Sequence, residues 1–195
     1  MQNVRTFPFR GFSKPLNLSY KGKLMNKGKR VCLTGFMGVG KSSVGRHLAQ
    51  ILRSDRIDLD FFIEKNEKRK IAAIIDTEGE STYRKIETAN LRKLLDETDA
   101  QVISLGGGTW TVDSNRELIR AKGLTSIWLE STFEHCWYNI KFSHKERPLA
   151  RDKSKAMQLF EERKKIYCLA DWHFIVKAEY SSYDIARLIY EEYFG

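Results

Sequence analysis

Residues 35–42 read Gly-Phe-Met-Gly-Val-Gly-Lys-Ser and match the pattern GxxxxGK[ST] in full. The run Arg30–Thr34 before them predicts a buried strand, and residues 41–53 have the apolar spacing of a helix. Glycines between a strand and a helix let backbone N–H groups surround phosphate oxygens, and the helix directs the positive end of its dipole at the same anion. This stretch, called the phosphate loop below, therefore predicts binding of a nucleoside triphosphate.

The loop residues also predict how the triphosphate and a metal ion are held. Lys41 carries a mobile positive charge for the β- and γ-phosphates, and the Ser42 hydroxyl is a hard oxygen ligand suited to Mg²⁺. The guanine-recognition sequence Asn-Lys-x-Asp does not occur in the chain, which argues against a GTPase. We expect a small kinase with these nucleotide-binding residues: Gly38, Val39, Gly40, Lys41, Ser42 and Ser43.

Predicted strands and helices alternate along the rest of the chain. Besides Arg30–Thr34, strands are expected over residues 55–60, 101–105, 125–129 and 172–176. Helices are expected over residues 41–53, 61–70, 71–75, 79–98, 113–122, 132–143, 154–169 and 181–194, and Asp113 is expected to cap its helix. This alternation predicts an α/β fold whose five-stranded parallel sheet is sandwiched by helices.

The charge of the chain is unevenly distributed. The 195 residues carry 34 basic and 25 acidic side chains, for a net charge of +9. Eight of the basic side chains and none of the acidic ones fall within residues 1–30, so the remainder is nearly neutral. We expect a basic, disordered leader at residues 1–29 and one folded domain at residues 30–195. A nucleic-acid-binding protein that uses this leader is the alternative that the net charge suggests.

Composition also bears on location. Three cysteines without CxxC spacing argue against a disulfide framework or a zinc site and are typical of a reducing compartment. No run approaches the roughly 20 apolar residues that a membrane-spanning helix needs. We expect a cytoplasmic protein. Organellar import through the leader is the alternative, because the leader lacks acidic residues, although it is rich in Lys rather than Arg.

Three further groups of residues point to an acceptor site. Asp58 and Asp60 stand two apart on an expected strand, so both carboxylates would share a face, one holding Mg²⁺ through water and the other taking a hydroxyl proton. Arg84 and Glu87 stand three apart on an expected helix, where an ion pair would orient the guanidinium group for a carboxylate ligand. The run Gly106–Gly108 follows a strand and would let a polyhydroxylated ring approach the backbone. Taken singly, they also fit a solvated strand end, a surface ion pair and a flexible turn.

Together, the order and spacing of these blocks resemble the shikimate kinase family, from about Arg30 to the C-terminus. The blocks are the phosphate loop continued to Gly45, Asp58-x-Asp60, Glu78-Gly-Glu80 with Tyr83-Arg84, Gly106–Gly108, Arg147-Pro148-Leu149, and Arg163…Tyr167…Ala170-Asp171. The resemblance implies a P-loop kinase fold like that of nucleoside monophosphate kinases, with a mobile lid. It also implies ATP-dependent phosphorylation of the 3-hydroxyl of shikimate, a step towards chorismate and the aromatic amino acids.

The resemblance assigns roles residue by residue. The implied catalytic residues are Lys41, Asp60 and Arg147. The implied substrate-binding residues are Asp60, Arg84, Gly106, Gly107, Gly108 and Arg163, of which the two arginines clamp the shikimate carboxylate. Arg147 joins the nucleotide-binding set, and Ser42 and Asp58 form the implied Mg²⁺ site. The substrate-binding segment spans about residues 58–88 and the lid about residues 142–154. The implied partners are shikimate and ATP, with no nucleic acid and no membrane, and a monomer is expected.

One position departs from the family pattern. The family usually has an Arg seven residues before the lid Arg, near the adenine, and this chain has Ile140 there. The sequence therefore does not predict how the adenine is held. A gluconate- or nucleoside-type kinase on the same scaffold is the second alternative, although Gly106–Gly108 and the pair Arg84 and Arg163 favour shikimate.

Overall fold

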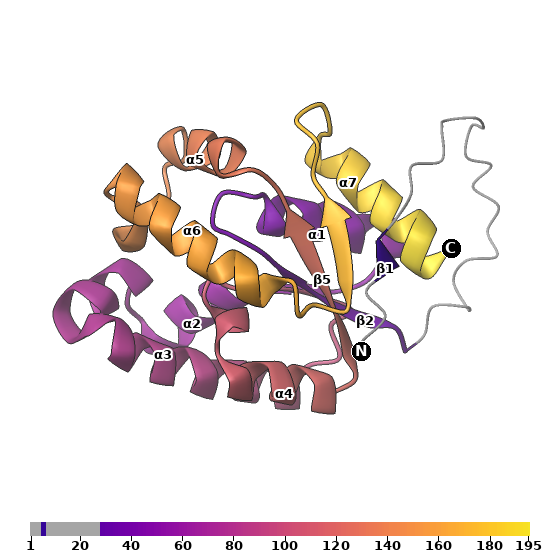
Figure 1. Ribbon diagram of the computed structural model, residues 1–195. Helices are drawn as coiled ribbons and strands as arrows, with labels where there is room; N and C mark the ends of the chain where they lie inside the picture. The colour runs from indigo at the N-terminus through magenta and orange to yellow at the C-terminus, as the bar shows by residue number, and fades with distance from the viewer. Residues whose placement is uncertain (1–4, 7–27) are drawn as a thin grey trace.

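The computed structural model describes residues 5–6 and 28–195 (Figure 1). Its centre is a six-stranded sheet in the order β1-β6-β5-β2-β4-β3, in which all neighbouring strands are parallel. The strands are β1 (Arg5–Thr6), β2 (Arg30–Thr34), β3 (Arg56–Asp58), β4 (Val102–Ser104), β5 (Leu124–Glu130) and β6 (Trp172–Ile175). The five expected strands are present, and β1 is added at the edge beside β6. Strand β1 falls within the leader expected at residues 1–29, of which residues 1–4 and 7–27 lie outside the described residues.

Helices flank the sheet, as predicted. They are α1 (Lys41–Leu52), α2 (Leu59–Glu67), α3 (Ile71–Glu97), α4 (Asp113–Ala121), α5 (Phe133–Lys141), α6 (Lys153–Tyr167) and α7 (Ser182–Ile189), with shorter helical turns at Thr109–Thr111, Pro148–Ala150 and Tyr190–Phe194. Helices α1 and α7 pack together beside the sheet, and α3 and α4 run along the opposite side (Figure 1). Within residues 5–6 and 28–195, none of the helices combines the length and the apolar composition that a membrane crossing requires.

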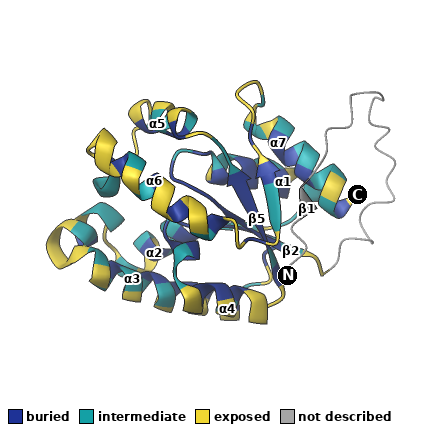
Figure 2. Cartoon of the chain, in the orientation of Figure 1, coloured by how far each residue is buried: buried dark blue, intermediate teal, exposed yellow. Residues whose placement is uncertain are grey.

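The central strands form the core. Val31, Cys32 and Leu33 of β2 and Val102 and Ile103 of β4 are fully buried, as expected for parallel strands covered on both faces. Figure 2 shows β2 and β5 largely in the colour of buried residues, among helices whose outer faces are exposed. The chain leaves β2 towards β4 and β3 on one side and returns to β5 and β6 on the other. The carboxyl end of β2 is therefore the point where the strand order reverses, and open α/β sheets bind ligands there.

Three local predictions differ from the structure or are refined by it. The strand expected to reach Asp60 ends at Asp58, whose carboxylate accepts a hydrogen bond from the Phe61 N–H and caps α2. Asp60 therefore lies in the first turn of α2, and the prediction that the two aspartates share a strand face is wrong. Asp113 is not the cap of α4, because Val112 holds that position and Asp113 pairs with Arg116. The helices expected at 71–75 and 79–98 form α3, interrupted at Gly79 by left-handed backbone (φ 82°).

Candidate active site

The phosphate loop joins β2 to α1 at the carboxyl end of β2. Gly38 and Gly40 have φ values of 85° and 100°, which residues with a Cβ rarely adopt. A Cβ at Gly38 would also collide with the carbonyl oxygen of Cys136, and the Asn139 side chain donates a 2.9 Å hydrogen bond to the Gly38 carbonyl. Gly40 is the N-cap of α1 and has no side chain to accept from the first-turn N–H groups. The N–H groups of Ser43 and Val44 donate to the Gly40 carbonyl oxygen instead. The N–H groups of Lys41 and Ser42 precede these helical hydrogen bonds and are left available to an anion.

Lys41 is folded back onto this loop. Its Nζ donates to the carbonyl oxygens of Gly35 at 2.7 Å and Phe36 at 3.0 Å, and the residue is only 8% exposed. Burial, followed by the nearby charge of Arg147, lowers the pKa of Lys41 to about 8, and the carboxylates of Asp60 and Asp58 oppose this shift. The side chain is thus a cation held at a site with an excess of positive charge, which favours an anionic ligand.

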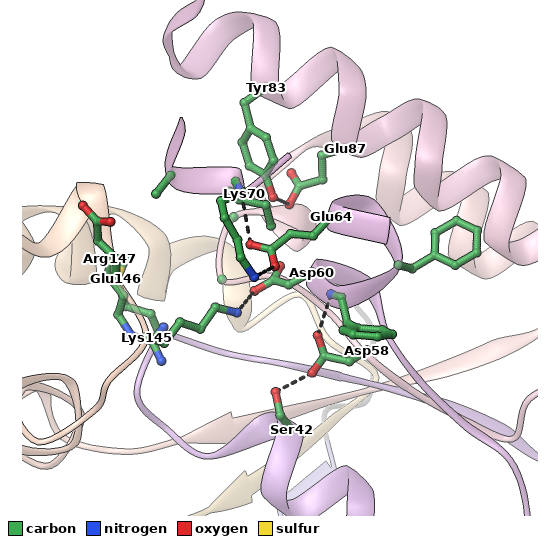
Figure 3. A pocket seen from close by; sticks show the side chains of 18 of the residues that line it. Ser42, Asp58, Asp60, Glu64, Lys70, Tyr83, Glu87, Lys145, Glu146 and Arg147 are labelled. Carbon is green, nitrogen blue, oxygen red and sulfur yellow. Dashed lines mark hydrogen bonds and ion pairs between the residues drawn. The ribbon is translucent and has the colours of Figure 1, made fainter. Parts of the chain in front are cut away.

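Two side-chain oxygens that could bind a metal ion lie side by side where α1 meets β3. The Ser42 hydroxyl donates a 2.5 Å hydrogen bond to Asp58 Oδ2 (Figure 3). Arg56 lies 3.9 Å from the same oxygen. A hydroxyl and a carboxylate oxygen are ligands that Mg²⁺ prefers, so this pair fits the predicted metal site.

Asp60 faces the end of β4. A Cβ at Gly106 would lie 2.8 Å from Asp60 Oδ1 and 2.9 Å from Glu87 Oε1, so a side chain there would push both carboxylates away. The other oxygen of Asp60, Oδ2, accepts a 2.6 Å hydrogen bond from Lys145 Nζ (Figure 3). The structure therefore brings Asp60 and Gly106 together, as predicted, and adds a lysine that no motif marked.

Arg84 is held by two carboxylates of α3. Its Nη1 lies 2.7 Å from Glu87 Oε2, which confirms the predicted pair, and its Nη2 lies 2.7 Å from Glu80 Oε1. Burial opposes the charge of Arg84, but the charge of Glu87 and the hydrogen bonds to both carboxylates raise the pKa above its ordinary value. Glu87 is 1% exposed and also accepts hydrogen bonds from Thr109 at 2.7 Å and Tyr83 at 3.4 Å. The guanidinium group is thus fixed in one orientation.

Arg163 approaches the same place from α6. Its side chain is 7% exposed, and Nη2 lies 3.6 Å from Glu80 Oε1, so Arg84 and Arg163 contact one carboxylate oxygen. A Cβ at Gly108 would collide with the Arg84 guanidinium group, and one at Gly107 would lie 3.7 Å from Arg163 Nη1. Two guanidinium groups therefore meet beside the glycine run. The spacing of Glu80, four residues before Arg84 on a helix, is the sequence signal that indicates its contact with Arg84.

Arg147 comes from residues 142–154, which join α5 to α6 and are expected from the sequence to form a lid; they are called the lid segment. Burial lowers the pKa of Arg147, while the carboxylate of Asp60 opposes the shift. Its Nε is buried and has no hydrogen-bond partner among the residues that the structure describes. A buried, unpaired donor of this kind is satisfied when a ligand supplies an acceptor.

Two adjoining cavities, of about 950 and 440 Å³, contain the site. The larger is lined by Arg84, Gly106, Gly108 and Arg163, and the smaller by the phosphate loop. The residues that line both are Met37, Ser42, Asp60, Gly107, Lys145 and Arg147. All the site residues predicted from the sequence lie along one cavity or the other. Ile140 lines neither of these two cavities, because it packs beneath the loop, where a Cβ at Gly38 would lie 3.0 Å from it.

The comparisons with known proteins agree with one another. A family model described as shikimate kinase matches residues 37–193. A shikimate kinase of Persephonella marina is 39% identical over 144 residues, which cover 73% of this chain and 86% of that protein. One of Streptococcus thermophilus is 40% identical over 136 residues, covering 69% of this chain and 78% of that protein.

Solved structures show the same likeness. Shikimate kinase from Acinetobacter baumannii, in complex with shikimate, has a TM-score of 0.79 at 30% identity, covering 87% of this chain and 95% of that chain. The shikimate kinase from Aquifex aeolicus has a TM-score of 0.68 at 31% identity, covering 82% of this chain and 92% of that chain. These similarities confirm the predicted fold class.

Proposed function

Because the chain belongs to the shikimate kinase family, we propose that it transfers the γ-phosphoryl group of ATP to the 3-hydroxyl of shikimate. The products are shikimate 3-phosphate and ADP, on the route to chorismate and the aromatic amino acids. The observation that carries this proposal is the meeting of Arg84 and Arg163 at the end of β4, beside Asp60 and next to the phosphate loop. The arginines can bind a carboxylate, Asp60 can bind a hydroxyl of a ring, and the phosphate loop can bind a triphosphate.

The two arginines bind the carboxylate of the substrate. A guanidinium fork pairs with a carboxylate through two parallel hydrogen bonds, and burial strengthens these bonds. Glu80 and Glu87 hold Arg84 in place, and α6 holds Arg163. The backbone of Gly106, Gly107 and Gly108 forms the face against which the ring lies, because the absence of Cβ atoms leaves room next to both guanidinium groups.

Asp60 accepts the proton of the acceptor hydroxyl. The hydroxyl oxygen then forms a bond to the γ-phosphorus, the bond between that phosphorus and the β–γ bridging oxygen breaks, and its electron pair leaves with ADP. Lys41 and Arg147 donate to the phosphate oxygens and balance the negative charge as it shifts towards the leaving group. The N–H groups at the start of α1 hold the phosphates in line.

Ser42 and Asp58 are the residues that would hold the magnesium ion that accompanies ATP. Their side-chain oxygens lie 2.5 Å apart at the mouth of the loop, and both are hard oxygen donors. In the described part of the chain no group of three or more His, Cys, Asp or Glu side chains could hold a metal by itself. This fits an ion that takes most of its ligands from phosphates and water. When bound, it neutralises charge on the β- and γ-phosphates.

The basic leader stands outside this chemistry. Every proposed site residue lies between Gly38 and Arg163, so we expect a chain without residues 1–27 to keep its activity. We expect no nucleic acid to take part in the reaction. All these residues come from one chain, so the proposed site needs no residue from a second copy, and the expected monomer would be competent for the reaction. Cys32, Cys136 and Cys168 are free thiols, which supports the cytoplasmic location.

A coupled assay of ADP release tests the proposal. The full chain is supplied with MgATP and, in separate reactions, with shikimate, gluconate or a set of nucleosides. ADP release should require shikimate. Release that is independent of shikimate, or faster with gluconate or a nucleoside, would contradict the proposed substrate.

A further inference from the structure

The lid segment brings a second cation to the site besides Arg147. Lys145 Nζ lies 2.6 Å from Asp60 Oδ2, although the two residues are 85 positions apart in the sequence. Figure 3 shows the Lys145 side chain reaching from the lid segment to Asp60, with Arg147 beside it. Lys145 thus contacts the carboxylate that the proposed reaction uses as its proton acceptor.

The position of Lys145 coincides with the path of the phosphoryl group. It is among the residues that line both cavities, and Asp60 and Arg147 are the other charged members of that set. The smaller cavity adjoins the phosphate loop and the larger one adjoins the substrate-binding arginines, so a phosphoryl group passing from one ligand to the other crosses this boundary. A cation here meets the negative charge of the transferred group.

The present partner of Lys145 conflicts with the proposed reaction. The ammonium group bound to Asp60 Oδ2 occupies one of the two oxygens of that carboxylate. The acceptor hydroxyl also needs a carboxylate oxygen within hydrogen-bond distance. An exchange of partners removes the conflict, because the hydroxyl takes over Asp60 and the ammonium group takes over phosphate oxygens.

We propose that Lys145 is a further catalytic residue, which leaves Asp60 when the acceptor binds and then donates to the oxygens of the transferring phosphoryl group. This proposal rests on the proposed function. The bonds that form and break are those already given, and Lys145 keeps its proton throughout. Its charge supplements that of Lys41 and Arg147 during the transfer.

The side chain is suited to such an exchange. It is 47% exposed and ends in a compact charge on a flexible stem, so it can change partners without disturbing the core. Lys41 shows the same pattern, because its Nζ is bound to the carbonyl oxygens of Gly35 and Phe36, which phosphate oxygens can replace. Both lysines are thus held by protein oxygens next to the cavities.

The lid segment also offers a matched control. Arg151 pairs with Asp76 of α3 through hydrogen bonds of 3.1 and 2.8 Å, and so also joins the lid segment to the substrate-binding segment. Both side chains are about half exposed and neither lines either of the two cavities. Arg151→Gln therefore removes a comparable charge whose own side chain lies outside both cavities, together with two ion pairs, the one to Asp76 and a 2.7 Å pair to Glu146 of the lid segment.

The experiment measures kcat and both KM values for the full-length wild type, Lys145→Gln, Lys145→Arg and Arg151→Gln. Lys145→Gln should lower kcat by about tenfold or more, with KM for shikimate unchanged or lower, because Asp60 loses a competing partner. Lys145→Arg, which keeps the charge, should restore most of kcat. Arg151→Gln should keep kcat within about twofold of the wild type. A purely structural role would instead raise KM in both Gln variants.

Two results would overturn the assignment. One is a kcat of Lys145→Gln within about twofold of the wild type, and the other is an equal fall in kcat for Arg151→Gln. A wild-type chain that does not turn over shikimate would overturn the proposed function and this role together. An active wild type with an unaffected Lys145→Gln would overturn the role of Lys145 alone.

Discussion

The Arg84 guanidinium group is tied to Glu87 by a 2.7 Å ion pair in which the carboxylate is 1% exposed. A charge so deeply buried is stable only with partners, and Glu87 also accepts hydrogen bonds from Thr109 and Tyr83. The pair therefore contributes both to stability and to the orientation of Arg84, the arginine that we propose binds the shikimate carboxylate.

Replacement of Glu87 should affect both properties. Glu87→Ala is expected to lower the free energy of unfolding by about 2 kcal/mol, because Arg84 and Thr109 lose a buried partner. It should also raise KM for shikimate, since Arg84 is no longer held. Urea unfolding and steady-state kinetics measure the two effects. The control is Glu78→Ala. The pair of Glu78 with Arg69 is exposed, so its loss should lower the free energy of unfolding by less than about 1 kcal/mol. Equal destabilisation by both changes would refute the role of Glu87.

Removal of the Arg163 guanidinium group should weaken the binding of one ligand selectively. Arg163→Ala is expected to raise KM for shikimate by about 30-fold, the equivalent of about 2 kcal/mol for a lost charge-assisted bond. KM for ATP should change little, because Arg163 lines the larger cavity and is not among the residues lining the smaller one. Lys164→Ala, an exposed neighbour on α6, serves as control. Equal weakening of ATP binding would contradict the assignment.

The pKa of Lys41 should make ATP binding depend on pH. Burial, followed by the charge of Arg147, lowers this pKa to about 8, so roughly half of the side chains are neutral at that pH. A bound triphosphate raises the pKa again, because it brings negative charge. ATP binding at about pH 8 should therefore take up roughly half a proton at Lys41, and affinity should fall as the pH rises further. Calorimetric titration in two buffers of different ionisation enthalpy measures this uptake.

Two variants identify the titrating group. Lys41→Met should abolish the proton uptake, whereas Lys141→Met, at an exposed position of α5, should keep it. Uptake of the same size in the wild type and in Lys41→Met would show that another group titrates.

Replacement of Asp60 should lower kcat and leave ATP binding unchanged. Asp60→Asn keeps the size of the side chain but can no longer take the hydroxyl proton, so kcat should fall by about 100-fold or more. KM for ATP should remain within about twofold of the wild type. Steady-state kinetics with each substrate varied in turn measures both constants. Unchanged turnover would refute the role of Asp60 as proton acceptor.

The features predicted correctly from the sequence are those that depend on residues close together in the chain. The phosphate loop was predicted because glycine spacing, a preceding strand and a following helix are contiguous, and the pair Arg84–Glu87 because residues three apart on a helix meet. The predicted end of β3 was wrong, because Asp58 caps α2. The alternation of Asp58 and Asp60 in the sequence does not indicate a helix cap. The contact of Lys145 with Asp60 could not be predicted, since it joins residues 85 positions apart and depends on where the lid segment lies.

We expect the phosphoryl group of ATP to end on the 3-hydroxyl of shikimate. ³¹P NMR of the full chain incubated with MgATP and shikimate reports which hydroxyl is phosphorylated. We expect one new phosphomonoester signal, coupled to the proton at C3 and formed in equal amount to ADP. Phosphorylation of another hydroxyl, or ADP formation accompanied by inorganic phosphate alone, would contradict it.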